Sequence, residues 1–544
     1  MNQYKNLLNS KLLIILIVIL AFVLRTYKLS NVPPSLYWDE ASLGYNAYSI
    51  LKTAHDEHGK FLPLTNFGAY GDYKPPLYIY ATVPSIFIFG LTEFAIRFPS
   101  ALFGTLTILL TYFLAKKFFE NEAIALLSAL FLAISPWHLQ FSRGAFEANL
   151  GLFLSVLGVL TFIKFAKDRP LYIFMSAGSF LAAMYTFTGQ RLFAPFILVV
   201  LCFQFRKELI KNWKYVLVAA FLSAILFWPL FRFVTGTIEG KLRFNEVTIF
   251  KDLKPINDSI RFKNEDNFSW WSGITHNRRL FYINQYLIHY FDAFNPTFLF
   301  FQGDVNPRLS IQAIGELYFF DLFLILAGIY FLFNKKQKFR FLIMGWLLIS
   351  PLGPATARET PHALRMIHIL PTFQLVAAYG TYQIYQLIKF KKMFVIGSIV
   401  IILASFFYYL HMYYVHYPRE NSGEWQYGYK QAVEYLSPLY NNVDHVVVTE
   451  AYGRPYIYFL IYMKIDPKNY YQHASVSRDD QFFYHVNSFD KLIFSNSPTS
   501  YALPGKTIFV TTPGNLPTNT KLLETVSQLD QKPVFDIGET VNEK

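Results

Sequence analysis

The sequence predicts a polytopic α-helical membrane protein of about eleven transmembrane helices, followed by a small external α/β domain. Three observations carry this fold class. Of the 544 residues, 53% are hydrophobic and only 16% are charged, whereas a typical soluble domain is about 25% charged. An aromatic content of 19% excludes intrinsic disorder, because disordered chains are poor in aromatic residues. Apolar runs long enough to cross a bilayer recur along most of the chain.

These apolar runs have lengths near the 17–25 residues that a transmembrane helix needs. They lie at residues 11–27, 94–115, 122–137, 147–166, 170–187, 191–205, 214–234, 317–333, 340–354, 364–388 and 393–415. The first is expected to be an uncleaved anchor, because the basic segment 25–28 follows it without a small-residue cleavage site. The stretch 75–90 is also apolar, but it is short and contains Pro84. We expect a re-entrant or interfacial helix there, with a true span as the alternative.

Lysine and arginine gather in every second connection between these runs. The basic connections lie at 116–117, 164–169, 206–214, 335–340 and 389–392. Because basic loops remain in the cytoplasm, we expect a cytoplasmic N-terminus in the plasma (inner) membrane and external segments at 28–93, 235–316 and beyond 417. This distribution accounts for the net charge of +13 without a nucleic-acid partner. Cys202 is the only cysteine, which excludes a disulfide within the chain.

The tail differs in texture from the rest of the chain. Strand-like runs at 445–449 and 507–511 alternate with helix-like runs at 429–436 and 521–529, and Pro-Gly pairs separate them. This alternation predicts an α/β domain. Two domains are therefore expected: a transmembrane domain over residues 1–416 and an external domain over residues 417–544.

The first external segment carries two adjacent acidic residues, Asp39 and Glu40, directly after the anchor. Trp38, Ala41 and Tyr45 follow three- and four-residue steps, which predict a helix with one apolar-aromatic face in the headgroup region. The acidic pair then occupies the first turn, where the helix dipole favours ionised carboxylates. A plain acidic cap is the structural alternative. The position beside a membrane anchor favours a catalytic role.

Basic residues also occur in three external segments, where the positive-inside rule makes them uncommon. They are Lys74, Arg143 with Glu147 four residues later, and Arg365 with His362 three residues earlier. Arg143 and Glu147 would share a helix face and could pair with each other, and Lys74 could simply snorkel. The functional interpretation is that these cations bind a lipid phosphate. We expect them to meet the acidic pair in one cavity at the outer leaflet.

Several segments of the membrane part occur in a familiar order. After the acidic pair come the Lys-Pro-Pro element at 74–76, EFAIRFPSALFG at 93–104, SPWHLQFSRGAFEANLG at 135–151 and ETPHALRMIHILP at 359–371. Together, over about residues 37–380, they resemble the polyprenyl-phosphate-sugar glycosyltransferases with the GT-C membrane fold. That superfamily includes protein O-mannosyltransferases and the aminoarabinose transferases of lipid A.

The resemblance implies a catalytic carboxylate at Asp39, with Glu40 beside it in the donor or acceptor site. In the chemistry we expect, Glu40 orients Asp39 or holds the acceptor. It also implies that Lys74 and Arg143 contact the donor phosphate. The remaining substrate-binding candidates are Asp72, Tyr73, Glu147, His362 and Arg365.

The metal requirement is left open. Aminoarabinose transferases carry a Glu directly before the lysine, but here Tyr73 occupies that place and Asp72 lies one position further back. Other potential ligands are spread over the external segment 235–316 without a zinc-binding spacing; they are Glu265, His276, His289 and Asp292. No cofactor is certain, and a divalent metal is the alternative.

The predicted activity is transfer of a hexose or pentose from a polyprenyl-phosphate donor to the hydroxyl of a protein, lipid or cell-wall glycan. The donor phosphate is a good leaving group when cations hold its charge, and Asp39 would take the hydroxyl proton as general base, with inversion at the sugar. The alternative is a flippase or transporter for a lipid or lipid-linked sugar. Such a protein should carry ionisable groups near the membrane midplane, and few are visible in the predicted spans.

Overall fold

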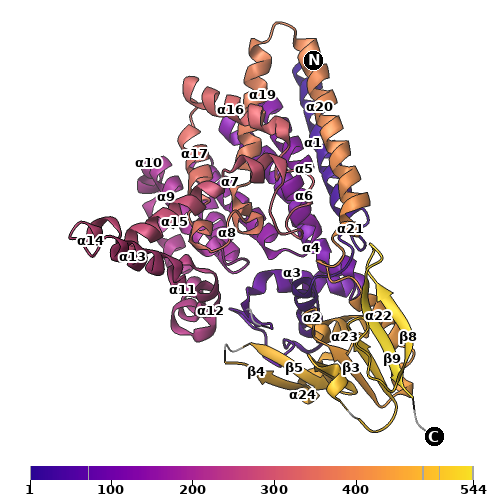
Figure 1. The fold of residues 1–544 in the computed structure, drawn as a ribbon. Helices are drawn as coiled ribbons and strands as arrows, with labels where there is room; N and C mark the ends of the chain where they lie inside the picture. The colour runs from indigo at the N-terminus through magenta and orange to yellow at the C-terminus, as the bar shows by residue number, and fades with distance from the viewer. Residues whose placement is uncertain (1, 71–72, 481–482, 502, 542–544) are drawn as a thin grey trace. The chain divides into compact units, whose positions relative to one another are not determined.

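The structure, a computed structural model, describes residues 2–70, 73–480, 483–501 and 503–541 (Figure 1). The chain divides into two compact units. The first, here the helical unit, comprises Met1–Arg25, Leu102–Ser142 and Glu147–Tyr409, and the second, here the mixed unit, comprises Thr26–Ala101, Arg143–Phe146 and Leu410–Lys544. The first predicted external segment therefore clusters with the tail, whereas the sequence predicts a boundary at 416–417.

The helical unit is built from α-helices joined by short 3-10 and π turns. Its elements are α1 (Asn2–Thr26), α4 (Glu93–Phe119), α5 (Glu122–Ile134), α6 (Pro136–Arg143), α7 (Glu147–Lys167), α8 (Tyr172–Met184), α9 (Gln190–Gln204), α10 (Arg206–Lys211), α11 (Trp213–Gly236), α12 (Ile238–Val247), η1 (Ile249–Lys251), α13 (Lys254–Glu265), α14 (Ser272–Thr275), α15 (Arg278–Asp292), η2 (Thr297–Phe301), α16 (Phe319–Asn334), α17 (Arg340–Ile349), η3 (Pro354–Thr356), α18 (Ala363–Met366), η4 (Ile367–Ile369), α19 (Thr372–Leu387) and α20 (Lys391–His411). One end of each of α1, α4, α6 and α20 belongs to the mixed unit.

Each of the eleven predicted spans contains a helix, although not every helix has full membrane length. Within the described residues, α4, α7, α11 and the stretch Lys391–Glu420 are long and apolar enough to cross a membrane. The pair α5 and α6, bent by 56° at Ser135, makes a fifth if it is one span, and α8, α9 and α16 are shorter apolar helices. The chain is thus a multi-pass membrane protein, and eleven remains the predicted number of spans.

The stretch 75–90 forms one helix, α3 (Pro76–Phe89), within the mixed unit. Its 14 residues extend only ~21 Å at 1.5 Å per residue, which is less than the ~30 Å of a hydrocarbon core. This length favours the re-entrant or interfacial interpretation.

The tail contains a mixed seven-stranded sheet in the order β4-β5-β6-β3-β7-β9-β8, drawn in orange and yellow in Figure 1. The central strand β3 pairs in parallel with both β6 and β7, and the outer strands pair antiparallel. The elements are η5 (Met412–His416), α21 (Tyr417–Glu420), α22 (Tyr429–Leu436), η6 (Tyr440–Asn442), β3 (His445–Thr449), α23 (Pro455–Tyr462), α24 (Pro467–His473), β4 (Ser475–Arg478), β5 (Tyr484–Phe489), β6 (Leu492–Ser495), η7 (Pro498–Ser500), β7 (Thr507–Thr511), β8 (Thr520–Ser527) and β9 (Pro533–Thr540).

The strands predicted at 445–449 and 507–511 and the helix at 429–436 are confirmed as β3, β7 and α22. The helix predicted at 521–529 is wrong, because residues 520–527 form the edge strand β8. This segment pairs along its length with β9, so ladder hydrogen bonds to a neighbour override its local helical pattern.

The helix α2 (Trp38–Thr53) begins where the sequence predicts, with both acidic residues in its first turn. The prediction of one apolar face is wrong, because polar residues such as Ser42 and Asn46 are buried as well. The reason is that α2 packs against α3 on one side and against α23 and α24 of the tail on others. Burial all round is typical of a core helix.

Candidate active site

The first turn of α2 brings Asp39 and Lys74 together. Lys74 lies in β2 (Tyr73–Lys74), which pairs with β1 (Phe67–Gly68) in a small antiparallel ladder. Its ammonium Nζ lies 3.2 Å from Oδ1 of Asp39. The lysine side chain is only 9% exposed, whereas the aspartate is 37% exposed. A carboxylate that is paired with an ammonium and still open to its surroundings can accept a proton from a bound hydroxyl.

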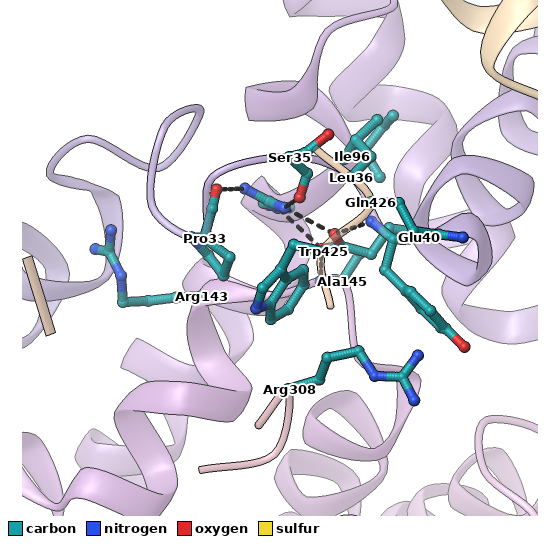
Figure 2. Close-up of polar contacts among 12 residues, drawn as sticks. Pro33, Ser35, Leu36, Glu40, Ile96, Arg143, Ala145, Arg308, Trp425 and Gln426 are labelled. Atoms are coloured by element: carbon teal, nitrogen blue, oxygen red, sulfur yellow. Dashed lines mark hydrogen bonds and ion pairs between the residues drawn. The ribbon is translucent and has the colours of Figure 1, made fainter. Parts of the chain in front are cut away.

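Glu40, the neighbouring acid, is buried and fully engaged as an acceptor. Nε and Nη2 of Arg97 donate to its two oxygens at 2.9 and 2.7 Å. The backbone N–H groups of Ala145 and Tyr37 also donate to it, at 2.7 and 3.1 Å. Figure 2 shows Glu40 and Ala145 within this network. Of the two roles implied for Glu40, the geometry supports orienting Asp39, because no oxygen of Glu40 is open to an acceptor.

Arg97 is itself enclosed by the segment that leads into α2. Its Nη1 donates to the carbonyls of Leu29 and Pro33 at 3.1 and 2.8 Å, and its Nη2 donates to the carbonyl of Ser35. The guanidinium carbon also lies 5.6 Å from the ring centroid of Trp425. One buried cation therefore links α4, the segment before α2 and the tail.

Tail residues hold the backbone at the start of α2. The side-chain Oε1 of Gln426 accepts the N–H of Trp38 at 2.9 Å, and the Tyr458 hydroxyl lies 2.5 Å from the same oxygen. The Tyr70 hydroxyl donates to the carbonyl of Trp38. Both backbone polar groups of Trp38, the residue before Asp39, are thus fixed from outside the helix.

Arg143, expected to contact a lipid phosphate, bonds to groups of the protein, and its contact with a phosphate stays a prediction. Its side chain is buried, and its Nε donates to the Tyr413 hydroxyl at 3.1 Å. Nη2 donates to the carbonyls of Tyr27 and Val32, each at 2.8 Å. Its guanidinium also lies over the rings of Tyr413 and Tyr414. The shared helix face with Glu147 is not formed, because α6 ends at Arg143 and α7 begins at Glu147.

Of the other predicted site residues, Glu147, His362 and Arg365 lie in the helical unit. His362 Nδ1 lies 3.9 Å from Oδ2 of Asp304, and Arg365 pairs with Glu359 at 3.6 Å. Burial raises the pKa of the Asp304 carboxyl, although the N–H of Ala363 donates to it at 2.6 Å. Asp72 lies outside the described residues, and Tyr73 is half-buried beside Lys74 in β2. Convergence of Arg365 with Asp39 stays a prediction.

A second buried acid, Glu57, lies in the mixed unit behind α2. Asn46 Nδ2 donates to its Oε1 at 2.9 Å, and its own backbone N–H donates to Asn46 Oδ1 at 3.1 Å. Burial raises the pKa of the Glu57 carboxyl to about 8. The adjacent His58 is stacked on Tyr484, and burial, aided by the charge of Arg478, lowers its pKa to about 4. Both groups are therefore neutral near pH 7.

Metal ligands do not gather in the part of the chain that the structure describes, where no group of three or more His, Cys, Asp or Glu side chains is arranged to hold an ion. His276 pairs with Asp266 at 2.9 Å, and His289 contacts the Ala357 carbonyl at 2.8 Å. Asp292 instead accepts a hydrogen bond from the Thr360 hydroxyl. A requirement for a divalent metal stays a prediction.

Two residues that bond to the start of α2, Arg97 and Gln426, were not singled out in the sequence. Arg97 is the only charged residue between Glu93 and Lys116 in a predicted span, and a charge within an apolar span is itself a signal for a special role. Gln426 offers no such signal, since glutamine is common in loops.

The chain is similar to known proteins in sequence and in fold. Residues 15–228 match the family model described as dolichyl-phosphate-mannose-protein mannosyltransferase (PMT). An uncharacterized protein of Aquifex aeolicus (strain VF5) is 28% identical over 228 residues, which cover 40% of this chain and 44% of that protein. Among solved structures, apo ArnT from Cupriavidus metallidurans superposes with a TM-score of 0.56 at 11% identity and covers 97% of both chains.

This chain shares the membrane GT-C fold of ArnT. The same ArnT bound to undecaprenyl phosphate superposes with a TM-score of 0.55 at 11% identity over 98% of each chain. The archaeal oligosaccharyltransferase AglB from Archaeoglobus fulgidus, solved with an inhibitory peptide and a dolichol-phosphate, gives a TM-score of 0.50 at 14% identity over 83% of this chain and 63% of AglB. The membrane fold expected from the resemblance is confirmed.

Proposed function

We propose that this protein transfers a sugar from a polyprenyl-phosphate-linked donor to an acceptor hydroxyl at the external face of the membrane. The observation that carries the proposal is the pair of Asp39 and Lys74, a part-exposed carboxylate 3.2 Å from a buried ammonium. It combines the base that the acceptor needs with the cation that the donor phosphate needs. The lipids named with ArnT and AglB, undecaprenyl phosphate and dolichol-phosphate, support a donor of this class.

In the proposed reaction the acceptor oxygen attacks the anomeric carbon of the donor sugar. The new carbon–oxygen bond forms as the bond from that carbon to the phosphate oxygen breaks, and the electron pair leaves with the phosphate. Asp39 takes the hydroxyl proton, and Lys74 stabilises the charge that grows on the phosphate. Attack opposite the leaving group inverts the configuration. The products are the glycosylated acceptor and polyprenyl phosphate.

Glu40 and Arg97 act as positioning residues in this scheme. The hydrogen-bonding groups of both side chains are engaged within the protein. The Glu40 carboxylate accepts four N–H groups, and the Arg97 guanidinium also donates to three backbone carbonyls. Their role is to hold the first turn of α2, and with it Asp39, in one geometry. Preorganisation of this kind is what makes an acid–base group effective.

The test is sugar transfer by the purified protein in lipid nanodiscs. The protein is incubated with radiolabelled polyprenyl-phosphate sugars, both hexoses and pentoses, and a membrane extract, and the labelled acceptor is identified. Asp39→Asn should abolish transfer while binding of the donor lipid persists. The matched control is Asp530→Asn, which removes a carboxylate paired with Lys532 at 2.7 Å on the tail surface. Transfer by Asp39→Asn at the rate of the control would refute the role of Asp39.

The flippase alternative predicts a different result in the same nanodiscs. A flippase moves lipid between leaflets without changing it, so no label would appear in an acceptor from any donor. The family match and the fold favour the transferase.

A further inference from the structure

The helix α15 presents an apolar face away from the protein. Leu280, Ile283, Leu287 and Phe291 follow three- and four-residue steps, and they are 47, 54, 46 and 64% exposed. This stripe is interrupted by one polar residue on the same side, Asn284. No residue of α15 is fully buried. A helix at a water-facing surface has the opposite arrangement, with its aliphatic side chains packed inward.

The other face of α15 is attached to the helical unit by polar groups. The hydroxyls of Tyr282, Tyr286 and Tyr290 donate to the backbone carbonyls of Asp252, Leu352 and Leu348 at 2.8, 3.1 and 2.8 Å, respectively. In water these hydroxyls would gain little from turning inward, because solvent satisfies them equally well. In an apolar solvent we expect this arrangement, in which the polar groups of the helix face the protein and its aliphatic groups face outward.

The tyrosine contacts fix the depth of α15 relative to its own unit. Leu348 lies in the last turn of α17, an apolar helix within a predicted span, and Leu352 follows that end. The helix α15 also packs on η3, directly after α17. It therefore lies level with the end of a membrane helix, where hydrocarbon gives way to headgroups.

The residues before α15 have the composition of a membrane interface. Phe268, Trp270 and Ile274 are 69, 83 and 64% exposed, and Arg278 and Arg279 begin the helix. Tryptophan prefers the headgroup level, and arginine pairs with lipid phosphates there. In Figure 1 the α13–α14 arm projects at the left, beyond α15.

We propose that α15, with the segment 268–274, lies in the plane of the membrane and that its stripe Leu280–Ile283–Leu287–Phe291 inserts among the lipid acyl chains. The occupant is the bilayer, because α11 of the same unit is long and apolar enough to cross a membrane, and only 11% of its 18-residue apolar window is buried. The segment that the sequence assigns to an external loop is then partly a lipid-facing element. The proposal does not depend on the transfer chemistry.

The test is spin-label accessibility in nanodiscs. Cys202 is the only cysteine, so Cys202→Ser gives a cysteine-free background in which Ile283→Cys, Leu287→Cys and Leu280→Cys each carry one label. Phe221→Cys on α11, 64% exposed, is the reference for lipid, and Asn519→Cys, an exposed residue before β8, is the reference for water. Collision with oxygen reports lipid, and collision with a water-soluble nickel chelate reports solvent.

Labels at 280, 283 and 287 should match the α11 reference, with high oxygen and low nickel accessibility. Nickel accessibility equal to that at 519 would place the face in water and overturn the proposal. Dipolar broadening between labels at position 283 would mean that a second copy of the chain covers the face, which also overturns it. All three positions are exposed, so the labelled proteins are expected to fold, and their melting temperatures check this.

Discussion

The sharpest prediction separates the two adjacent acids of α2. Glu40→Gln keeps the size of the side chain but places an amide NH2 group among the donors that Glu40 accepts. Glu40 is 3% exposed and Arg97 is fully buried, and they form a bidentate pair with distances of 2.9 and 2.7 Å. Removing one partner leaves the guanidinium as an uncompensated buried charge, which typically costs about 3–5 kcal/mol.

Asp39→Asn is the matched comparison, one residue away and with the same kind of change. In its pair with Lys74 the aspartate is partly open to solvent, and the amide oxygen of asparagine can still accept a hydrogen bond from the buried ammonium. We therefore expect a loss of about 1 kcal/mol. In a unit of about 150–250 residues, 1 kcal/mol shifts the melting temperature by about 2–4 °C. We therefore expect Glu40→Gln to melt about 10 °C lower than the wild type, and Asp39→Asn to melt within a few degrees of it.

The assay is thermal unfolding of the purified protein in detergent, followed by tryptophan fluorescence, together with sugar transfer at a temperature where both variants are folded. Asp39→Asn should be stable and inactive, and Glu40→Gln should be unstable with residual activity below its melting point. A Glu40→Gln protein that melts like the wild type would refute the structural role assigned to this carboxylate. An equally stable but inactive Glu40→Gln would instead make Glu40 the reacting acid.

Three further predictions follow from the same unit. Lys74→Met should lower the rate of transfer about 100-fold or more, which initial rates and donor binding measure. Its melting temperature should stay near that of the wild type, because the Asp39 carboxylate that loses its partner is hydrated. Burial raises the pKa of Glu57 to about 8, whereas the unfolded chain releases this proton above the ordinary glutamate pKa of about 4.3. The free energy of unfolding therefore falls as the pH rises between these two values. Glu57→Gln should flatten the profile of melting temperature against pH, and an unchanged profile would contradict this reasoning. Gly453→Ala should destabilise the protein by about 1–3 kcal/mol, because Gly453 has φ +117° and an added Cβ would lie 2.3 Å from the Trp38 ring, and wild-type melting would contradict this contact.

Local signals in the sequence predict much of the fold. The start of α2 at Trp38 and the strands β3 and β7 are confirmed, because acidic residues in a first turn and β-branched runs between turns act within a few residues. The error at β8 has the opposite origin. Its partner β9 decides its conformation through hydrogen bonds, and the helical pattern of residues 521–529 contains no trace of that neighbour.

The candidate site divides in the same way. The sequence could single out Asp39 and Lys74, since each stands out in its own segment. It could not predict the ion pair of Glu40 with Arg97, because the two residues lie 57 positions apart. It also could not predict that Arg143 is buried, because its partner Tyr413 lies 270 positions away. Burial of an ion depends on which distant segments pack around it, and one sequence does not report that packing.

The hydrogen bond from Trp38 to Gln426 joins residues 388 positions apart, and this separation has a consequence for biosynthesis. At about 5–20 residues per second, a ribosome needs roughly 20–80 s to reach the glutamine after it has made the tryptophan. During that interval the nascent polypeptide is already in the membrane, but the first turn of α2 does not yet have its hydrogen bond to Gln426. Premature termination before the last quarter of the message should therefore yield an inert fragment instead of an unregulated catalyst.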